Sequence, residues 1–300
     1  MKKVIVIGSG FAGLSSAAYL SKEGFDVTVV EKNNQIGGRA RNFKVQGYTF
    51  DMGPSWYWMP EIFDNFFHSF NFKTKDFYEL KKLDPGFKIV FDNADMILPA
   101  NWNEICDLFD RYEDNGAKKL NKFMEDAEKK YSIGLRFLYN SPGLSVTELL
   151  KKDVLFNANK LQLLTSYRKH IKRHFTDPRL ISLLEFPVLF LGTSAESAPA
   201  LYSLMAYSGI KQGTFYPMGG FAKVIDSMAE VCKNNGVKFL LEEQVTKINI
   251  SNKTAESVTT KTQELPADFV VGAADYAHIE SKLLDTKYQN YDSSYWESRE

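Results

Sequence analysis

The sequence has few cysteines, no net charge and no long hydrophobic run. Its two cysteines, Cys106 and Cys232, are isolated, so neither a disulfide framework nor a Cys-x-x-Cys motif is expected, and this usage suits a reducing cytoplasm. The 37 basic and 37 acidic residues balance without forming a basic block, which argues against a nucleic-acid partner. Because no apolar run reaches about eighteen residues, no membrane-spanning helix is expected. The first predicted strand starts at Lys3, so no signal peptide is expected before it.

Residues 1–31 carry the pattern of a nucleotide-binding βαβ unit. An apolar strand is expected over residues 3–7, a helix over residues 14–23 and a second apolar strand over residues 26–30. The turn between the first strand and the helix reads Gly8-Ser9-Gly10-Phe11-Ala12-Gly13. This order predicts an α/β fold with a Rossmann-like parallel sheet.

Each glycine of this turn has its own expected role. Gly8 permits the tight turn, Gly10 lets a pyrophosphate approach the backbone, and Gly13 lets helix and strand pack closely. The helix N-terminus offers free N–H groups to the phosphates. Glu31, followed by Lys32, stands where an acid accepts hydrogen bonds from a ribose and repels a 2′-phosphate.

A second glycine motif follows, with the sequence Gly37-Gly38-Arg39. It is placed to fold back over the pyrophosphate, adding backbone donors and a guanidinium group. A flexible turn is the alternative interpretation. After it, residues 42–50 alternate around Gly47 and predict a hairpin.

These motifs resemble the FAD-binding segment of flavin amine oxidases and carotenoid desaturases. Three further segments narrow the resemblance to the bacterial and fungal phytoene desaturases: Phe50-Asp51-Met52-Gly53-Pro54-Ser55, Pro199-Ala200-Leu201-Tyr202, and Tyr216-Pro217-Met218-Gly219-Gly220-Phe221. The resemblance implies that FAD is the cofactor and that Gly53, Pro54 and Ser55 lie beside it. It also implies that the backbone of Val245 contacts the adenine, and that residues 267–275 return a strand to the nucleotide sheet.

The activity implied by the resemblance is desaturation of a long-chain isoprenoid such as phytoene in carotenoid biosynthesis, with electrons passed to quinone or oxygen. Asp51, Glu185 and Glu196 are general-base candidates by position only, so no catalytic residue is assigned. Three alternatives stay open: a flavin amine oxidase, a carotenoid isomerase or ketolase on the same scaffold, and an FAD-binding scaffold without activity.

The expected organisation is discontinuous. Residues 1–80 and 215–280 are expected to form the FAD-binding domain, and residues 81–214 a mixed α+β domain facing the substrate and the membrane. Residues 281–300 read as the start of a truncated C-terminal region. Since family members continue well beyond this length, we expect a fragment of a longer product, which leaves the activity of these residues alone an open question.

A helical region is expected over residues 149–175, and its last part is strongly basic. His170 and His174 have the spacing of metal ligands, but four cations and no nearby carboxylate accompany them, so no metal is predicted. The basic stretch suits contact with anionic lipid headgroups, and an ordinary solvated helix explains it equally well. We therefore expect a cytoplasmic protein bound peripherally to the inner face of the membrane.

Overall fold

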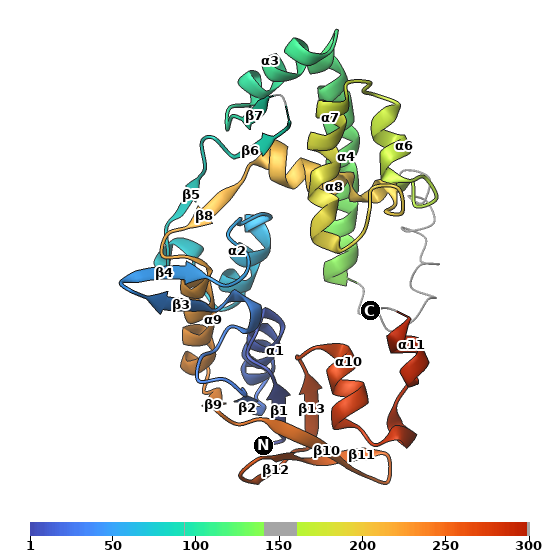
Figure 1. Ribbon diagram of the computed structural model, residues 1–300. Helices are drawn as coiled ribbons and strands as arrows, with labels where there is room; N and C mark the ends of the chain where they lie inside the picture. The colour runs from blue at the N-terminus through green and yellow to red at the C-terminus, as the bar shows by residue number, and fades with distance from the viewer. Residues whose placement is uncertain (93, 141–160, 299–300) are drawn as a thin grey trace. The chain divides into compact units, whose positions relative to one another are not determined.

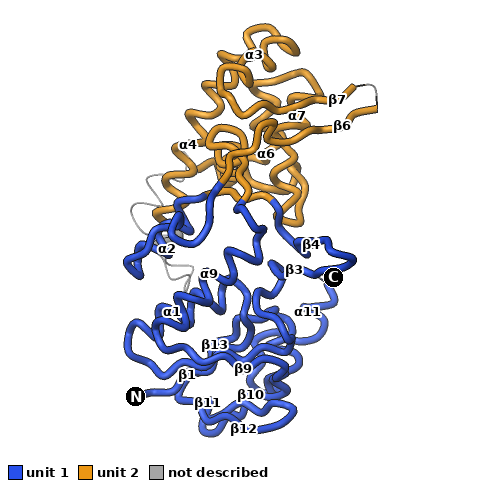
Figure 2. Tube along the Cα trace, turned by 90° about the vertical axis from the view of Figure 1, so that its left-hand side faces the viewer, with its two compact units in different colours: residues 1–55, 60–80, 217–300 blue, residues 56–59, 81–216 orange. Residues whose placement is uncertain are grey.

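The computed structural model describes residues 1–92, 94–140 and 161–298 (Figure 1). The chain divides into two compact units, coloured separately in Figure 2. Unit 1 contains residues 1–55, 60–80 and 217–300, and unit 2 contains residues 56–59 and 81–216. That residues 1–80 and 215–280 bind FAD and that residues 81–214 face the substrate stay predictions.

Unit 1 is built on a parallel sheet of four strands in the order β13-β1-β2-β9. The strands are β1 (Lys3–Ile7), β2 (Asp26–Val30), β9 (Lys238–Leu240) and β13 (Phe269–Gly272). Helix α1 (Phe11–Lys22) connects β1 to β2 and packs against α9 (Phe221–Asn234), which leads into β9. The expected α/β Rossmann-like fold is confirmed, and β13 is the returning strand, in register with β1.

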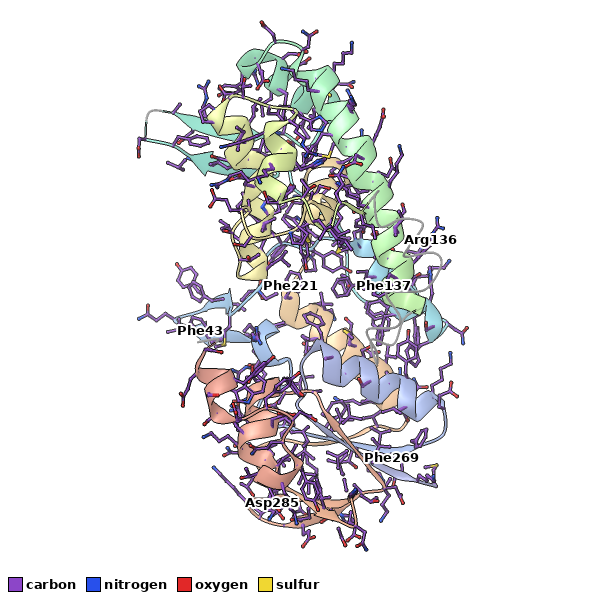
Figure 3. All side chains as sticks on the ribbon, turned by 90° about the vertical axis from the view of Figure 1, so that its right-hand side faces the viewer. Phe43, Arg136, Phe137, Phe221, Phe269 and Asp285 are labelled. Atoms are coloured by element: carbon purple, nitrogen blue, oxygen red, sulfur yellow. The ribbon has the colours of Figure 1, made fainter. Side chains whose placement is uncertain are left out.

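The remaining elements of unit 1 surround this sheet. A three-stranded antiparallel sheet separates β9 from β13 along the chain, and the predicted hairpin and a short helix follow β2. Phe43, labelled in Figure 3, lies on the hairpin and is 48 % exposed. The elements are β3 (Asn42–Val45), β4 (Tyr48–Asp51), α2 (Pro60–Ser69), β10 (Val245–Ser251), β11 (Thr254–Thr260), β12 (Glu264–Pro266), α10 (Tyr276–His278) and α11 (Ser293–Glu297).

Unit 2 is mainly helical. Its core is a single cluster of buried aliphatic and aromatic side chains, centred on residues such as Phe109, Phe123 and Leu184. The hairpin of β6 with β7 is antiparallel, whereas β5 pairs with β8. The elements are β5 (Leu80–Lys82), β6 (Phe87–Val90), β7 (Asp95–Leu98), α3 (Trp102–Tyr112), α4 (Gly116–Asn140), α6 (Tyr167–Lys172), α7 (Pro178–Glu185), α8 (Ser203–Ala206) and β8 (Phe215–Pro217).

The predicted helix over residues 149–175 is shorter than expected. The part of the predicted helix 149–175 that precedes residue 161 lies outside the described residues, and the rest is helical only in α6. Ser166 caps α6, because its hydroxyl accepts a hydrogen bond from the backbone N–H of Lys169. Strand β9 stops at Leu240, and Glu242 just after it adopts a left-handed conformation with φ 59°. No helix within the described residues has the length and apolar character needed to cross a membrane.

Candidate functional site

A cleft of about 790 Å³ opens in unit 1 beside the carboxyl ends of β1 and β2. Ligands of open parallel sheets bind at this edge. The turn after β1, the end of β2, the second glycine motif and the chain after β13 all contribute to its wall. The lining residues are 7–12, 30–33, 37–41, 54, 243–245, 273–275, 278 and 283.

The turn after β1 brings backbone, rather than side chains, to the cleft. Gly8 has a φ of 102°, and a Cβ there would lie 3.1 Å from the carbonyl oxygen of Ala273. Gly13 is packed so tightly that a Cβ would lie 2.0 Å from the carbonyl oxygen of Gly8. Both positions therefore require glycine. The N-terminus of α1, starting at Phe11, opens onto the cleft with its unpaired N–H groups.

The second glycine motif is bonded to this turn. The N–H of Gly37 donates to the carbonyl oxygen of Ser9 at 2.9 Å, and Arg41 Nε donates to the carbonyl oxygen of Gly38 at 2.8 Å. Arg39 is exposed and lines the cleft. The motif is thus hydrogen-bonded to the turn, and its contact with a pyrophosphate stays a prediction.

Glu31 is buried at the end of β2 and is held by four hydrogen bonds. Its Oε2 accepts from the Ser9 N–H at 3.1 Å and from Ser9 Oγ at 2.6 Å. Its Oε1 accepts from the backbone N–H of Asn33 at 3.0 Å and from the Asn33 side-chain amide. Burial raises the pKa of Glu31, but the hydrogen bonds from Ser9 and Asn33 outweigh burial and place the pKa below its usual value. The four bonds match the roughly four acceptor sites of an ionised carboxylate, so a ribose hydroxyl would share or replace one of them.

Most of the predicted cofactor residues meet at the cleft. Its lining includes Gly8, Ser9, Gly10, Phe11, Ala12, Glu31, Lys32, Gly38, Arg39, Pro54 and Val245. Gly13, Gly53 and Ser55 are not part of the lining. Gly53 instead packs behind the second glycine motif, where a Cβ would lie 2.1 Å from the carbonyl oxygen of Arg39.

The sequence analysis missed several lining residues. Ala273, Ala274 and Asp275 follow β13, and their place could be inferred from the pairing of β13 with β1. Asn33 gave no local signal, because its role depends on the side-chain position of Glu31. The others are Ile7, Val30, Ala40, Arg41, Glu243, Gln244, His278 and Leu283.

The three acidic candidates for a general base have structural partners. Asp51 Oδ1 accepts a hydrogen bond from the N–H of Phe221, the first residue of α9, at 3.1 Å. Glu185 and Glu196 both bind the guanidinium of Arg168, each with a distance of 2.6 Å. These contacts give none of them a catalytic role.

The statement that no carboxylate lies near His170 and His174 is wrong. Asp126 of α4 approaches His170, with 3.2 Å between Oδ2 and Nε2, because the packing of unit 2 brings the two helices together. Asp126 also pairs with Lys130 at 2.6 Å. No group of three potential metal ligands occurs within the described residues.

The donors and acceptors of the cleft fit a nucleotide that carries a pyrophosphate. Gly10 and Gly38 leave a side-chain-free approach to backbone N–H groups at the start of α1, while Arg39, Arg41 and Lys32 supply positive charge. That Glu31 accepts hydrogen bonds from a ribose stays a prediction.

Comparisons with known proteins agree with this geometry. The family model for flavin-containing amine oxidoreductases matches residues 11–296. A carotenoid 3,4-desaturase from Haloarcula japonica is 34 % identical over 99 % of this chain and 60 % of its own length. A phytoene desaturase from Fusarium fujikuroi is 31 % identical over 94 % of this chain and 51 % of its own length. A solved putrescine oxidase has a TM-score of 0.62 and 16 % identity, covering 95 % of this chain and 60 % of that structure.

These findings confirm the resemblance expected from the sequence. The match to the desaturases extends over nearly the whole chain, whereas the chain itself spans only about half to 60 % of their lengths. The putrescine oxidase shares the fold at a much lower identity.

Proposed function

Since the chain belongs to the family of flavin-containing amine oxidoreductases, we propose that it takes part in FAD-dependent desaturation of a long-chain isoprenoid such as phytoene. The observation that carries this proposal is that its desaturase relatives match nearly the whole chain at 31 % to 34 % identity. The family model gives an oxidoreductase with a flavin cofactor; the isoprenoid substrate and the choice of FAD are the proposal.

FAD is the flavin that suits the cleft, because a pyrophosphate and an adenosine ribose match its donors and acceptors. Glu31 would accept hydrogen bonds from the ribose, and the N-terminus of α1 with Arg39 would bind the pyrophosphate. The backbone of Val245, a buried residue of the lining, would contact the adenine.

Desaturation removes two hydrogens, as a hydride equivalent and a proton, from adjacent carbons of the substrate. The redox chemistry comes from the bound flavin, which takes up the hydride equivalent. The chain's own task is to bind and orient the cofactor through the turn after β1 and the second glycine motif. No side chain is assigned to the departing proton. Quinone or oxygen is the proposed final acceptor of the electrons.

A hydrocarbon substrate dissolves in membranes, so we place the protein at a membrane surface. Lys169 and Lys172 of α6 and Arg173, its C-cap, are exposed, and their spacing puts them on one side of the helix. His170 and Ile171 are buried on the other side. Leu164, just before this helix, is fully exposed. Cations beside exposed apolar side chains suit the surface of an anionic bilayer.

The test is a desaturation assay. The purified chain, reconstituted with FAD, is mixed with phytoene in phospholipid vesicles and a quinone, and the visible spectrum of the extracted lipids is recorded. We expect absorption bands of longer conjugated polyenes, and none with the variant Glu31→Arg, which removes the ribose acceptor. A flavin-loaded chain that leaves phytoene unchanged but releases peroxide from an added amine would replace the proposal with an amine oxidase.

A further inference from the structure

We propose that Ser9 is a positioning residue whose buried hydroxyl ties the ribose-binding acid Glu31 to the second glycine motif, so that both face the cofactor together. This inference rests on the FAD site proposed above. It assigns a role to a buried side chain whose hydroxyl donates to Glu31.

The Ser9 hydroxyl has a hydrogen-bond partner both as a donor and as an acceptor. Ser9 is 0 % exposed, and its Oγ lies 2.6 Å from Glu31 Oε2. The same oxygen lies 3.3 Å from the donating N–H of Gly37. A hydroxyl has a single hydrogen to donate, and here that hydrogen is directed at Glu31. It is therefore not available to a bound nucleotide.

The backbone of Ser9 forms hydrogen bonds with the same two residues, Glu31 and Gly37. Its N–H donates to Glu31 Oε2 at 3.1 Å, and its carbonyl oxygen accepts from the N–H of Gly37 at 2.9 Å. One residue thus joins the turn after β1, the end of β2 and the loop at Gly37. Replacement by alanine removes only the hydroxyl contacts and leaves the backbone contacts in place, so the fold of the βαβ unit is expected to survive.

The hydroxyl also controls the charge of Glu31. Burial favours the neutral acid, and the Ser9 hydroxyl makes the largest opposing contribution, ahead of the bonds from Asn33. Without the hydroxyl the pKa of Glu31 rises. A protonated Glu31 has lost its charge and part of its accepting capacity, and so it binds ribose hydroxyls less well.

Other ionisable groups face the same cleft and are left unchanged by this substitution. They are Lys32, Arg39, Arg41, Glu243, Asp275 and His278. Because all variants share them, a difference between the pH profiles of two variants reports on Glu31.

The experiment compares Ser9→Ala with Ser227→Ala. Ser227 is also buried, at 1 % exposure, and its hydroxyl donates to the carbonyl oxygen of Lys223 at 2.7 Å within α9. Because Ser227 does not line the cleft, Ser227→Ala is a control for the loss of a buried hydroxyl elsewhere in the protein. The dissociation constant of FAD is measured for the purified chain by flavin fluorescence between about pH 5 and about pH 8. We expect Ser9→Ala to bind FAD about tenfold more weakly at neutral pH, with a larger loss in acid. Ser227→Ala should follow the wild type at every pH.

A double-mutant cycle with Glu31→Gln identifies the partner. A glutamine does not titrate, so in its background Ser9→Ala should add less than about threefold and the extra acid dependence should vanish. The inference is overturned if Ser9→Ala binds FAD like the wild type, or if its effect is the same size in the glutamine background. A wild-type chain that does not bind FAD at all would overturn the proposed cofactor site and this inference together.

Discussion

Gly10 and Gly38 meet backbone to backbone at the cleft. A Cβ at position 38 would lie 3.2 Å from the Cα of Gly10, and Gly38 has a φ of 57°. The two glycine motifs, separated in sequence by α1 and β2, therefore lie backbone against backbone at this point. This contact holds the second motif over the N-terminus of α1, where a pyrophosphate would bind.

Gly38→Ala should therefore weaken FAD binding. The added methyl group pushes the two motifs apart, and the left-handed backbone adds a strain of about 1 kcal/mol. We expect a loss of at least about tenfold in FAD affinity, measured by fluorescence titration. Gly47→Ala is the matched control, since Gly47 has a φ of 82° and nothing within 4 Å of a Cβ. Equal flavin affinities of the two variants would contradict a role for the Gly10–Gly38 contact.

Asp51→Ala should destabilise the protein without a specific effect on chemistry. Asp51 accepts a hydrogen bond from the N–H of Phe221 at the start of α9, as an N-terminal capping acid does. Its loss should cost about 1 kcal/mol in the free energy of unfolding, measured by urea denaturation. Asp51→Asn keeps an accepting oxygen and should recover most of this stability. If Asp51→Asn instead kept full stability but abolished turnover, Asp51 would be a catalytic acid or base.

Local patterns in the sequence predicted the nucleotide-binding half of the fold well. The turn from Gly8 to Gly13 and the acid at Glu31 define the βαβ unit because their spacing follows from strand, turn and helix geometry alone. The returning strand β13 followed from the family resemblance, and its pairing with β1 bears it out.

Contacts between distant segments were beyond the reach of these patterns. The sequence around His170 and His174 showed no nearby carboxylate, whereas tertiary packing buries His170 against Asp126. The predicted helix was drawn to residue 175, past the end of α6 at Lys172. A separate helix, α7, follows after Asp177, whose side chain accepts from the N–H groups of Arg179 and Leu180. Asn33 was missed since only the folded position of Glu31 gives it a partner.

The ion pair of Asp126 with Lys130 should matter more for stability than an exposed pair. Lys130 is fully buried, and its Nζ lies 2.6 Å from Asp126 Oδ2 and 3.2 Å from the carbonyl oxygen of Ala200. Asp126→Asn would leave this ammonium without its carboxylate, at a cost of about 3 kcal/mol in the free energy of unfolding. The control Asp95→Asn breaks the exposed pair with Lys88 and should cost less than about 1 kcal/mol. If urea denaturation gave similar losses in the free energy of unfolding for Asp126→Asn and Asp95→Asn, the buried pair would stabilise the protein no more than the exposed one.

The same pair predicts how stability changes with pH. Burial raises the pKa of Asp126, but the close contacts with His170 and Lys130 outweigh it and lower the pKa from 3.8 to about 2. The contribution of Asp126 to stability is therefore complete above pH 3.8 and is lost as the pH falls toward about 2. In Asp126→Asn this part of the acid dependence should disappear, which urea denaturation at a series of pH values would reveal.

The cations of α6 should control binding to anionic membranes. Replacing Lys169, Lys172 and Arg173 by glutamate removes three positive charges from one side of the helix and adds three negative ones. Each cation near an anionic bilayer contributes about 1 kcal/mol, so the affinity for vesicles containing phosphatidylglycerol should fall at least about a hundredfold in a sedimentation assay. Glutamate at the exposed Lys253, Lys261 and Lys282 gives the same change in net charge away from α6 and should leave most of the binding intact. If both triple variants lost binding equally, the attraction would come from the overall charge of the protein, and α6 would not be the membrane-facing surface.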